Sequence, residues 1–331
     1  MTSQIAADEK PPLSPSGLRE MESAEAPVPR CAICGAPLQS SSSAVVVRLE
    51  RSRLVRCASC GSWTYFPRLT ADAQAGLHKA EAYFEHPYFR HRRRSTGPLR
   101  RRCREVFTRL ADGANLRTLE GERLLDVGCD TGAFLKASAE MFGVLPVGVD
   151  VSEAAVDEAK RKGIEAYRAS LETAPAHLSN LAAITAIDVI EHVASPRAFL
   201  EAVYERLRPS GVVYLETPNV ASSVYRVGRA LCRMSHGHPR AFFERLFPVQ
   251  HAQYFTVDSL RMLAQHCGFE VVRLDTRRLP LRDIGTSLIV KAGVAGLQIA
   301  DRMVPSDRIL ICALLRRPHS AAGEQFPRSR T

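Results

Sequence analysis

Short apolar runs alternate with helix-like segments from about Glu122 onward, and this alternation limits the fold more than any other feature of the chain. Strands that alternate with helices are typical of βαβ units with right-handed crossovers. We therefore predict an α/β fold with a doubly wound, mostly parallel sheet. The predicted strands are Arg123–Val127, Val144–Val149, Ile164–Tyr167, Ala182–Ile187 and Val212–Glu216, and the predicted helices are Ala133–Met141, Ser152–Gly163 and Pro196–Leu207.

Two later apolar runs are predicted to complete a seven-stranded sheet. Glu270–Leu274 and Arg308–Leu315 would form an antiparallel hairpin at the edge of this sheet. Pro and Gly predict a turn at Arg208–Gly211, just before the fifth strand. Residues 220–250 and 276–306 fall outside the alternation, so we interpret them as insertions.

Two Cys-x-x-Cys pairs precede the predicted sheet, Cys31 with Cys34 and Cys57 with Cys60. Each pair can direct two thiolates at one ion, and two pairs complete a closed tetrahedral site of the kind that holds structural Zn²⁺. The alternatives are a redox dithiol or free buried thiols. A redox pair normally opens a helix after a strand, and neither pair has that setting. We therefore predict a zinc ribbon.

Composition divides the rest of the chain. The first residues are rich in Pro, Ser, Glu and Ala and have little apolar surface to bury, which predicts disorder. They also lack an apolar export signal, which favours a cytoplasmic location with reduced thiols. The predicted segments are a disordered leader over 1–29, the zinc ribbon over 30–69, a basic helical connector over 70–118, the α/β domain over 119–318 and a disordered tail over 319–331.

A glycine-rich turn is predicted between the first strand and its helix, within Leu124–Gly132. Doubly wound sheets bind ligands at this edge. Asp150 ends the next strand, roughly 20 residues after Gly128, where a carboxylate can accept both hydroxyls of an adenosine ribose. Asp126 lies inside the end of the first strand. A carboxylate at that position opposes a pyrophosphate and suits a ligand that carries an ammonium and a sulfonium.

These segments resemble the class I S-adenosylmethionine-dependent methyltransferases, in the family's order and spacing over about residues 120–275. The resemblance is carried by LLDVGCDTG (124–132), GVDVSEAAVDEAKRKG (148–163), ASLE (169–172), ITAIDVIEHV (184–193), RPSGVVYLETPN (208–219) and HAQYFTVDSLRMLAQHCGFEVV (251–272). The Cys-rich module before this domain is similar to a group of bacterial zinc-ribbon methyltransferases that often act on sugars or secondary metabolites. A Rossmann-like methyltransferase fold and S-adenosylmethionine as the cofactor are implied by this resemblance.

The resemblance also implies roles for individual residues. Asp126, Gly128 and Gly132 would line the amino-acid end of the cofactor, and Asp150 would hold its ribose. Asp130 stands where the family usually has Gly, and it would either bind the cofactor's ammonium or weaken the fit of the loop. The predicted cofactor-binding residues are Asp126, Gly128, Cys129, Gly132, Asp150, Val151, Ser170, Leu171, Asp188 and Val189.

Two histidines are candidate catalytic residues. His192 follows the fourth strand, near the expected position of the methyl group, and a His can act as a general base near neutral pH. Its alternative role is to brace the following helix. His251 is predicted to line the acceptor pocket, with bracing again as the alternative.

The chain has 45 Lys+Arg against 35 Asp+Glu, which favours an anionic acceptor, an acidic surface or nucleic acid. Its basic cluster at 90–104 lacks the interleaved aromatic residues of an RNA-binding platform, which argues against nucleic acid. No run approaches the roughly 20 apolar residues that span a bilayer. Leu288–Val304 is a candidate amphipathic helix for a membrane surface or a homodimer contact, with core packing as the alternative.

Together these features predict a methyltransferase that uses S-adenosylmethionine and structural Zn²⁺. Its acceptor would be a small molecule, such as a sugar, a quinone-like compound or a secondary metabolite. Two alternatives stay open at this point. One is an RNA methyltransferase, because zinc modules and Arg-rich segments also serve nucleic acids. The other is a non-catalytic binding protein that retains the methyltransferase fold.

Overall fold

The computed structural model of this 331-residue chain describes residues 29–38, 45–48, 53–66, 68, 96–114, 119–238, 240–278 and 308–319. Leu288–Val304 lies outside these residues, as do most of the predicted leader, most of the predicted tail and part of the basic connector. Within the described ranges, no helix is both long enough and apolar enough to cross a bilayer.

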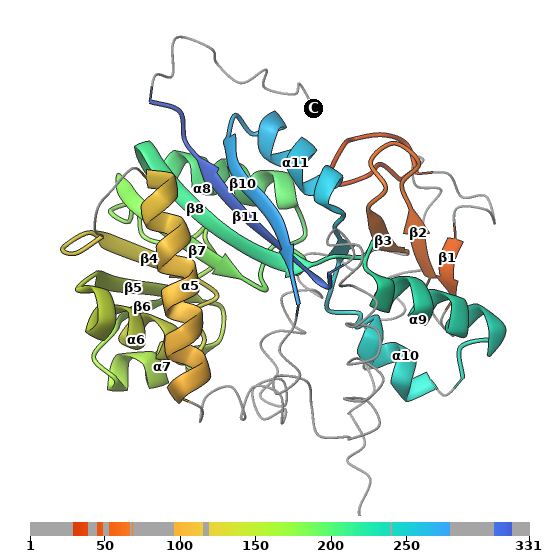
Figure 1. Ribbon diagram of the computed structural model, residues 1–331, viewed down its shortest axis with the longest axis horizontal. Coiled ribbons are helices and arrows are strands. Elements are labelled where there is room, and N and C mark those ends of the chain that lie inside the picture. Colours follow the sequence, from red (N-terminus) through yellow and green to blue (C-terminus); the bar gives the residue numbers. More distant parts are fainter. Residues whose placement is uncertain are drawn as a thin grey trace, which may run out of the picture.

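A seven-stranded mixed sheet forms the centre of the molecule (Figure 1). Its strands are β4 (Arg123–Val127), β5 (Leu145–Asp150), β6 (Glu165–Arg168), β7 (Leu181–Ile187), β8 (Leu207–Pro218), β10 (Glu270–Arg277) and β11 (Leu310–Arg316). They are arranged in the order β10-β11-β8-β7-β4-β5-β6. β4 to β8 are parallel, whereas β11 runs antiparallel to both of its neighbours. The predicted doubly wound, mostly parallel sheet is confirmed.

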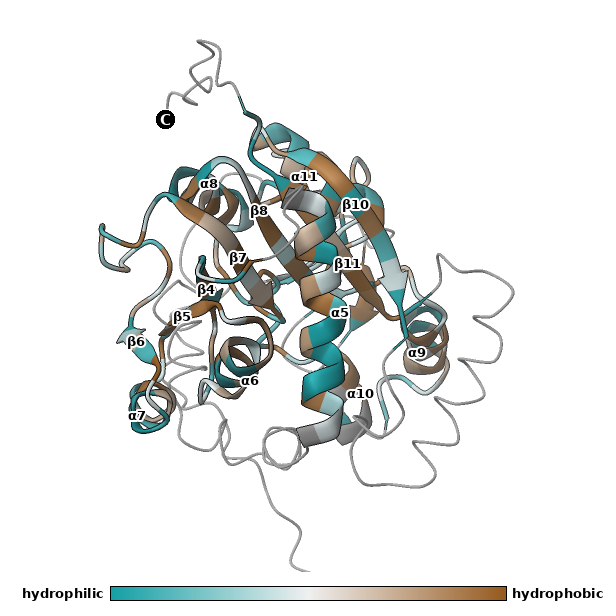
Figure 2. Cartoon of the chain, turned by 60° about the vertical axis from the view of Figure 1, so that its left-hand side comes forward, coloured by the Kyte–Doolittle hydropathy of each residue, from teal (hydrophilic) through white to brown (hydrophobic). Residues whose placement is uncertain are grey.

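Helices cover both faces of this sheet. The first group consists of α5 (Thr96–Ala114), α6 (Ala133–Phe142) and α7 (Glu153–Arg161), and the second of α8 (Pro196–Arg206) and α11 (Val257–His266). Neighbouring strand residues point to opposite faces, so Leu124 packs with the first group and Leu125 with the second. Because both faces are buried, strands such as β5 and β8 are hydrophobic along much of their length (Figure 2).

One prediction about the start of a strand is wrong. The predicted turn at Arg208–Gly211 lies inside β8, because residues there continue the pairing, with the N–H of Ser210 donating to the carbonyl oxygen of Arg317 at 2.9 Å. The Pro and Gly residues that predicted a turn instead mark a local distortion of the β8 backbone, where Ser210 has a φ of +62°. The predicted antiparallel hairpin at the edge of the sheet is confirmed. β10 pairs with β11 and forms the edge, and β11 lies between β10 and β8.

A second, smaller sheet contains the Cys-rich segment. Its strands are β1 (Val45–Arg48), β2 (Arg53–Arg56), β3 (Trp63–Phe66) and β9 (Gln253–Tyr254), in that order. β9 belongs to the far end of the chain, and it pairs with β3 through Trp63–Tyr254 and Thr64–Gln253. The Thr64 hydroxyl also donates to Gln253 Oε1 at 2.7 Å. The Cys-rich segment is therefore joined to the large domain by backbone pairing.

The predicted insertion at 220–250 packs on this second sheet. It contains α9 (Ser223–Met234) and α10 (Arg240–Leu246), which lie beside β1 to β3 in Figure 1. Trp63, Tyr225, Phe247 and Tyr254 share one buried aromatic cluster. Strands from the N-terminal segment and helices from the insertion thus form a common core at one end of the molecule.

Candidate functional site

The residues that follow β4 form the predicted glycine turn. Gly128 and Gly132 have φ values of +72° and +69°, a region that glycine enters without a Cβ penalty. The N–H groups of Gly128 and Cys129 both donate to the carbonyl oxygen of Val149 on β5, at 2.8 and 3.1 Å. A Cβ on Gly128 would lie 2.7 Å from Cγ2 of Val189. The turn therefore has no room for a side chain at this position.

Asp150, the last residue of β5, orients this turn. Its Oδ2 accepts the N–H of Asp130 at 3.0 Å, and its Oδ1 accepts the N–H of Ser152 at 2.9 Å. Burial raises the pKa of Asp150 to about 6, although both N–H groups lower it. Asp130 has a φ of +48°, which short polar residues tolerate. The turn thus accommodates Asp130 in place of the family's usual glycine and uses its N–H to hold Asp150.

Asp126 lies inside the end of β4 and is buried. The Thr185 hydroxyl on β7 donates to its Oδ1 at 2.6 Å. Burial, together with the nearby carboxylates of Asp150 and Asp130, raises the pKa of Asp126 to about 7. A nearby positive charge would lower this pKa again, because it stabilises the ionised form. This edge of the sheet is therefore suited to a cation and unsuited to a pyrophosphate.

The residues after β6 and β7 form the rest of the candidate site at the carboxyl ends of the parallel strands. Asp188 directly follows β7, with a φ of +59°, and its N–H donates to the carbonyl oxygen of Glu216 at 2.9 Å. Val189 is next to it and faces the Gly128 turn. Ser170 follows β6, where its N–H donates to the Thr173 hydroxyl at 3.1 Å. The predicted cofactor-binding residues therefore gather on the loops after four parallel strands.

Three of the predicted cofactor-binding residues have side chains that are buried or half-buried in the protein. Leu171 is 1% exposed and packs in the sheet core, so in this conformation only its backbone can meet a ligand. Cys129 is also buried, and its Sγ fills the space beside Gly148. Val151 is half-buried between Asp150 and the N-cap residue Ser152. The ligand roles of the whole set stay predictions.

The two candidate catalytic histidines lie against each other. The ring centroids of His192 and His251 are 4.7 Å apart in an edge-to-face arrangement. Nδ1 of His192 lies 2.9 Å from the carbonyl oxygen of Gln250, to which it donates. Burial, together with the neighbouring His251, lowers the pKa of His192 to about 3. A group with so low a pKa is a poor proton acceptor at neutral pH, so this geometry favours the bracing role over the role of free base.

Glu191 is a member of this site to which the sequence argument assigned no role. It is 1% exposed, and its Oε2 accepts the Thr217 hydroxyl at 2.8 Å. Burial raises the pKa of Glu191 well above its usual value. One ligand atom each from Glu191, His192 and His251 lie within 4.8 Å of one another. A carboxylate next to a histidine in the sequence was the available signal, but His251 comes from a distant segment.

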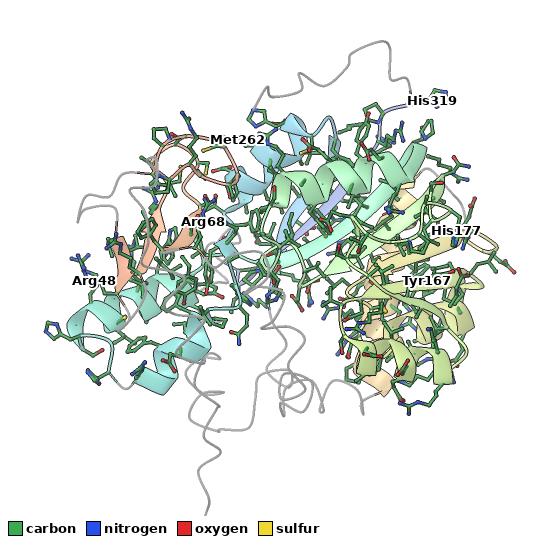
Figure 3. The ribbon with its side chains drawn as sticks, turned by 180° about the vertical axis from the view of Figure 1, so that it is seen from behind. Arg48, Arg68, Tyr167, His177, Met262 and His319 are labelled. Carbon is green, nitrogen blue, oxygen red and sulfur yellow. The ribbon has the colours of Figure 1, made fainter. Side chains whose placement is uncertain are left out.

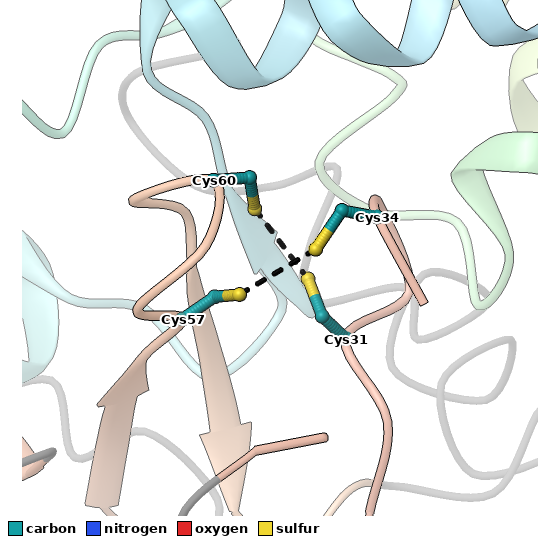
Figure 4. A group of neighbouring side chains, drawn as sticks. All are labelled: Cys31, Cys34, Cys57 and Cys60. Atoms are coloured by element: carbon teal, nitrogen blue, oxygen red, sulfur yellow. Dashed lines mark hydrogen bonds between the residues drawn. The ribbon is translucent and has the colours of Figure 1, made fainter. Parts of the chain in front are cut away.

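The four predicted metal-binding cysteines come together in one cluster (Figure 4). The Sγ atoms of Cys31 and Cys60 are 3.6 Å apart, and those of Cys34 and Cys57 are 3.5 Å apart. A tetrahedral site with Zn–S bonds of about 2.3 Å has S–S edges of about 3.8 Å. These residues therefore fit a tetrahedral ion.

Both cysteine knuckles have the same backbone geometry. The N–H of Gly35 donates to the carbonyl oxygen of Cys31, and the N–H of Gly61 donates to that of Cys57, at 2.9 and 3.0 Å. The two glycines have φ values of +73° and +74°. Left-handed glycine closes each turn and directs both thiols of a pair to one side.

Three arginines of the 220–250 insertion lie on α9. Arg226 and Arg233 are exposed on α9. Arg229 places its guanidinium carbon 5.8 Å from the centre of the Trp63 ring. These positions are typical of a solvated basic helix, and the anionic acceptor expected from the net charge stays a prediction.

The chain belongs to the methyltransferase domain family. The model of that family matches residues 89–274, which is more than half of the chain. This range contains the glycine turn, Asp126, Asp150 and both histidines. The class expected from the sequence motifs is confirmed.

Similar curated proteins include the ubiquinone biosynthesis O-methyltransferases of Marinobacter nauticus and Idiomarina loihiensis. The first is 32% identical over 111 residues and the second is 32% identical over 108 residues. The matches cover 31% and 30% of this chain and 46% and 44% of those proteins. The chain thus spans less than half of the length of these relatives.

Matching solved structures include magnesium protoporphyrin IX methyltransferase from Synechocystis with bound SAH and a SAM-dependent methyltransferase from Archaeoglobus fulgidus. The first match has a TM-score of 0.48 and 14% identity and covers 74% of this chain and 99% of that one. The second has a TM-score of 0.47 and 16% identity and covers 72% and 100%. Because these scores are below 0.5, the fold assignment rests on the strand order and the family match.

Proposed function

We propose that this chain is an S-adenosylmethionine-dependent methyltransferase that acts on a hydroxyl group of a small, quinone-like acceptor. The observation that carries the proposal is the pair of carboxylates, the buried Asp126 and the half-buried Asp150, around a glycine turn that excludes a side chain. The names of the similar proteins favour oxygen as the methylated atom. An anionic acceptor and a cytoplasmic location belong to the same proposal.

The residues of the sheet edge fit the cofactor. S-adenosylmethionine would supply a methyl group that is already activated by a positively charged sulfonium. Asp126 would pair with positive charge at the amino-acid end, and Asp150 would accept the ribose hydroxyls through its remaining lone pairs. Gly128 would let the backbone approach the cofactor closely. The main contribution of the protein would then be to align the acceptor with the methyl group.

We further infer that Cys31, Cys34, Cys57 and Cys60 hold a structural Zn²⁺. Support comes from the four thiols within one cluster and from the matching glycine turns. Ser62 adds a hydroxyl 3.0 Å from Sγ of Cys60 and 3.4 Å from Sγ of Cys31, which suits an outer hydrogen bond to thiolates. Four protein ligands leave no open position, so the ion would stabilise the fold and take no part in methyl transfer.

Titration calorimetry with S-adenosylmethionine tests the proposed function. Asp150→Ala removes the predicted ribose ligand, and Gly128→Val fills the turn. We expect Asp150→Ala to raise the Kd of the cofactor at least about tenfold, because a lost charged hydrogen bond costs roughly 1.5–3 kcal/mol. Gly128→Val should also raise the Kd, because a Cβ there would lie 2.7 Å from Cγ2 of Val189 and force the turn to move. Asp157→Ala, on the exposed face of α7, is the matched control and should leave the Kd unchanged.

Transfer of a labelled methyl group to a panel of small hydroxylated aromatic compounds then tests the reaction itself. Methylation of one of these acceptors would support the proposal. Absence of cofactor binding by the folded wild-type chain would refute it. Binding without transfer to any component of a cell extract would favour the non-catalytic alternative, and transfer to RNA would favour an RNA methyltransferase.

A further inference from the structure

A cluster of three potential metal ligands lies beside the proposed methyl-transfer site, apart from the four cysteines. Glu191 and His192 lie on the loop after β7, and His251 precedes β9. Ligand atoms from all three lie within 4.8 Å of one another. The two imidazole rings meet edge to face with 4.7 Å between their centroids. Two histidines and one carboxylate form a common ligand set for divalent transition metals.

The carboxyl group of Glu191 is buried and only partly hydrogen-bonded. It is 1% exposed, and its Oε2 already accepts the Thr217 hydroxyl. Its other oxygen, Oε1, is buried without a hydrogen-bond partner among the described residues. The nearby carboxylates of Asp188 and Glu216 make the surroundings of Glu191 more negative. A bare buried carboxylate oxygen is costly, and either a proton or a bound cation offsets this cost.

His192 is held in the orientation that metal-binding histidines usually have. Its Nδ1–H donates to the backbone carbonyl oxygen of Gln250 at 2.9 Å. This hydrogen bond places the ring's lone pair on Nε2, which is the atom that a metal would bind. Gln250 directly precedes His251, so one short segment orients His192 and also supplies the third ligand.

We propose that Glu191, His192 and His251 bind a divalent transition-metal ion such as Zn²⁺, Fe²⁺ or Mn²⁺. Oxygen and imidazole nitrogen ligands suit these ions. The Thr217 hydroxyl and the Gln250 carbonyl would act as outer hydrogen-bond partners that hold Glu191 and His192 in place. Three protein ligands leave coordination positions open, in contrast to the closed cluster of four thiolates.

The role of this ion rests on the proposed function. A hydroxyl of the acceptor would bind at an open position, where the divalent charge lowers its pKa. The O–H bond breaks and the proton leaves to solvent, while the metal keeps its oxidation state. The acceptor oxygen then forms its bond to the methyl carbon as the carbon–sulfur bond breaks, which leaves a neutral thioether. This route needs no free histidine base, because both imidazoles would be bound to the metal.

Cobalt titration of the metal-free full-length chain tests the proposal. The four-thiolate cluster gives Co²⁺ an intense thiolate-to-metal absorption band, whereas a site of two histidines and a carboxylate gives only weak visible bands. We expect the wild type to bind two Co²⁺ ions, one of each kind. Glu191→Gln and His251→Gln should lose the weak bands and retain the thiolate band, which also shows that the cysteine cluster is intact.

Two further variants sharpen this test. Thr217→Val keeps all three ligands and removes an outer hydrogen bond, so we expect a loss of about 10–100-fold in the affinity of the second Co²⁺. His177→Gln is the control. His177 lies next to Tyr167 near β6, on the opposite side of the molecule from Arg48 of β1 (Figure 3), and its loss should leave both Co²⁺ ions bound.

The outcomes separate this proposal from the proposed function. A wild-type chain that binds a single Co²⁺ would overturn the metal site, and so would a Glu191→Gln or His251→Gln variant that still binds both ions. Titration calorimetry with S-adenosylmethionine on the same samples tests the proposed methyltransferase function independently. If the second Co²⁺ binds and S-adenosylmethionine does not, the metal site is supported and the methyltransferase function is refuted.

Discussion

Asp126 is buried and Asp150 is half-buried, and loss of contact with water raises their pKa values to about 7 and about 6. In the free chain, both therefore gain protons in a pH range where exposed aspartates are fully ionised. A ligand with an ammonium and a sulfonium binds more tightly to the ionised forms. Because these two residues gather on one sheet edge, proton binding and cofactor binding are expected to compete there.

This competition predicts a pH dependence of cofactor affinity. Both pKa values are raised, so the ionised forms predominate above about pH 7 and are lost as the pH falls through 7 and then 6. We expect affinity to fall by about tenfold per pH unit for each carboxylate that must ionise. Calorimetry from pH 5 to pH 8 measures this slope. Asp126→Asn should remove the upper part of the slope, and a flat profile for the wild type would contradict the assignment.

At the scale of secondary-structure elements, the pairing of β3 with β9 is the feature that connects the cysteine cluster to the candidate active site. β9 begins two residues after His251, and β3 begins three residues after Cys60. The Thr256 hydroxyl, just after β9, also donates to the carbonyl oxygen of Cys60 at 3.4 Å. An ion that orders the cysteine knuckles would thus also order the segment that carries Gln250 and His251.

Loss of the metal from the cysteine cluster is therefore expected to disturb β3. Trp63, the single tryptophan of the chain, lies on β3 and is buried, so its fluorescence reports on this strand. We expect Cys60→Ser to lose the metal at this site, to shift Trp63 emission to longer wavelength and to lower the Tm. Cys103→Ser is the control, because Cys103 is buried against α6 and outside the cluster. Unchanged emission in Cys60→Ser would show that the ion does not order β3.

At the scale of the whole molecule, a buried cluster of salt bridges connects α5 and the edge strand β10 to β8 in the sheet. Glu216 of β8 is 1% exposed and accepts Arg102 of α5 at 2.7 Å and Arg277 of β10 at 2.6 Å. The Tyr214 hydroxyl donates to the same carboxylate at 3.0 Å. Burial alone would raise the pKa of Glu216, but the two guanidinium groups outweigh it and lower the pKa to about 2.

Glu216→Gln is accordingly expected to destabilise the fold. It leaves two largely buried arginines without their counter-charge, which typically costs about 3–5 kcal/mol. Because the pKa of Glu216 is lowered, its contribution is present above its unfolded pKa near 4.5 and is lost as the pH falls toward 2. Urea unfolding at pH 7 and pH 3 measures both effects.

The matched control for this substitution is Glu270→Gln. Glu270 is 52% exposed and pairs with Arg316, so its loss should cost less than about 1 kcal/mol. Equal losses of unfolding free energy in the two variants would contradict the importance of burial in the Glu216 cluster.

Much of the large domain was predictable from local sequence because its signals are local. Helix caps such as Ser152, the glycines of the turn and the apolar runs of the parallel strands each act within a few residues. The turn at Arg208–Gly211 was mispredicted because Pro and Gly normally end a strand, whereas here backbone pairing with the segment after β11 continues β8. Long-range pairing outweighed the local preference at this point.

The sequence alone determined the strand alternation, the carboxylates at the strand ends and the two cysteine pairs, because each follows from periodicity or short spacing. Only the tertiary structure decided which distant groups meet. Thr64 bonds Gln253 across 189 positions, Glu216 bonds Arg102 across 114, and His192 bonds Gln250 across 58. Such contacts depend on how layers pack rather than on the preference of any one segment. For that reason the site formed by Glu191, His192 and His251 becomes visible only in the folded chain.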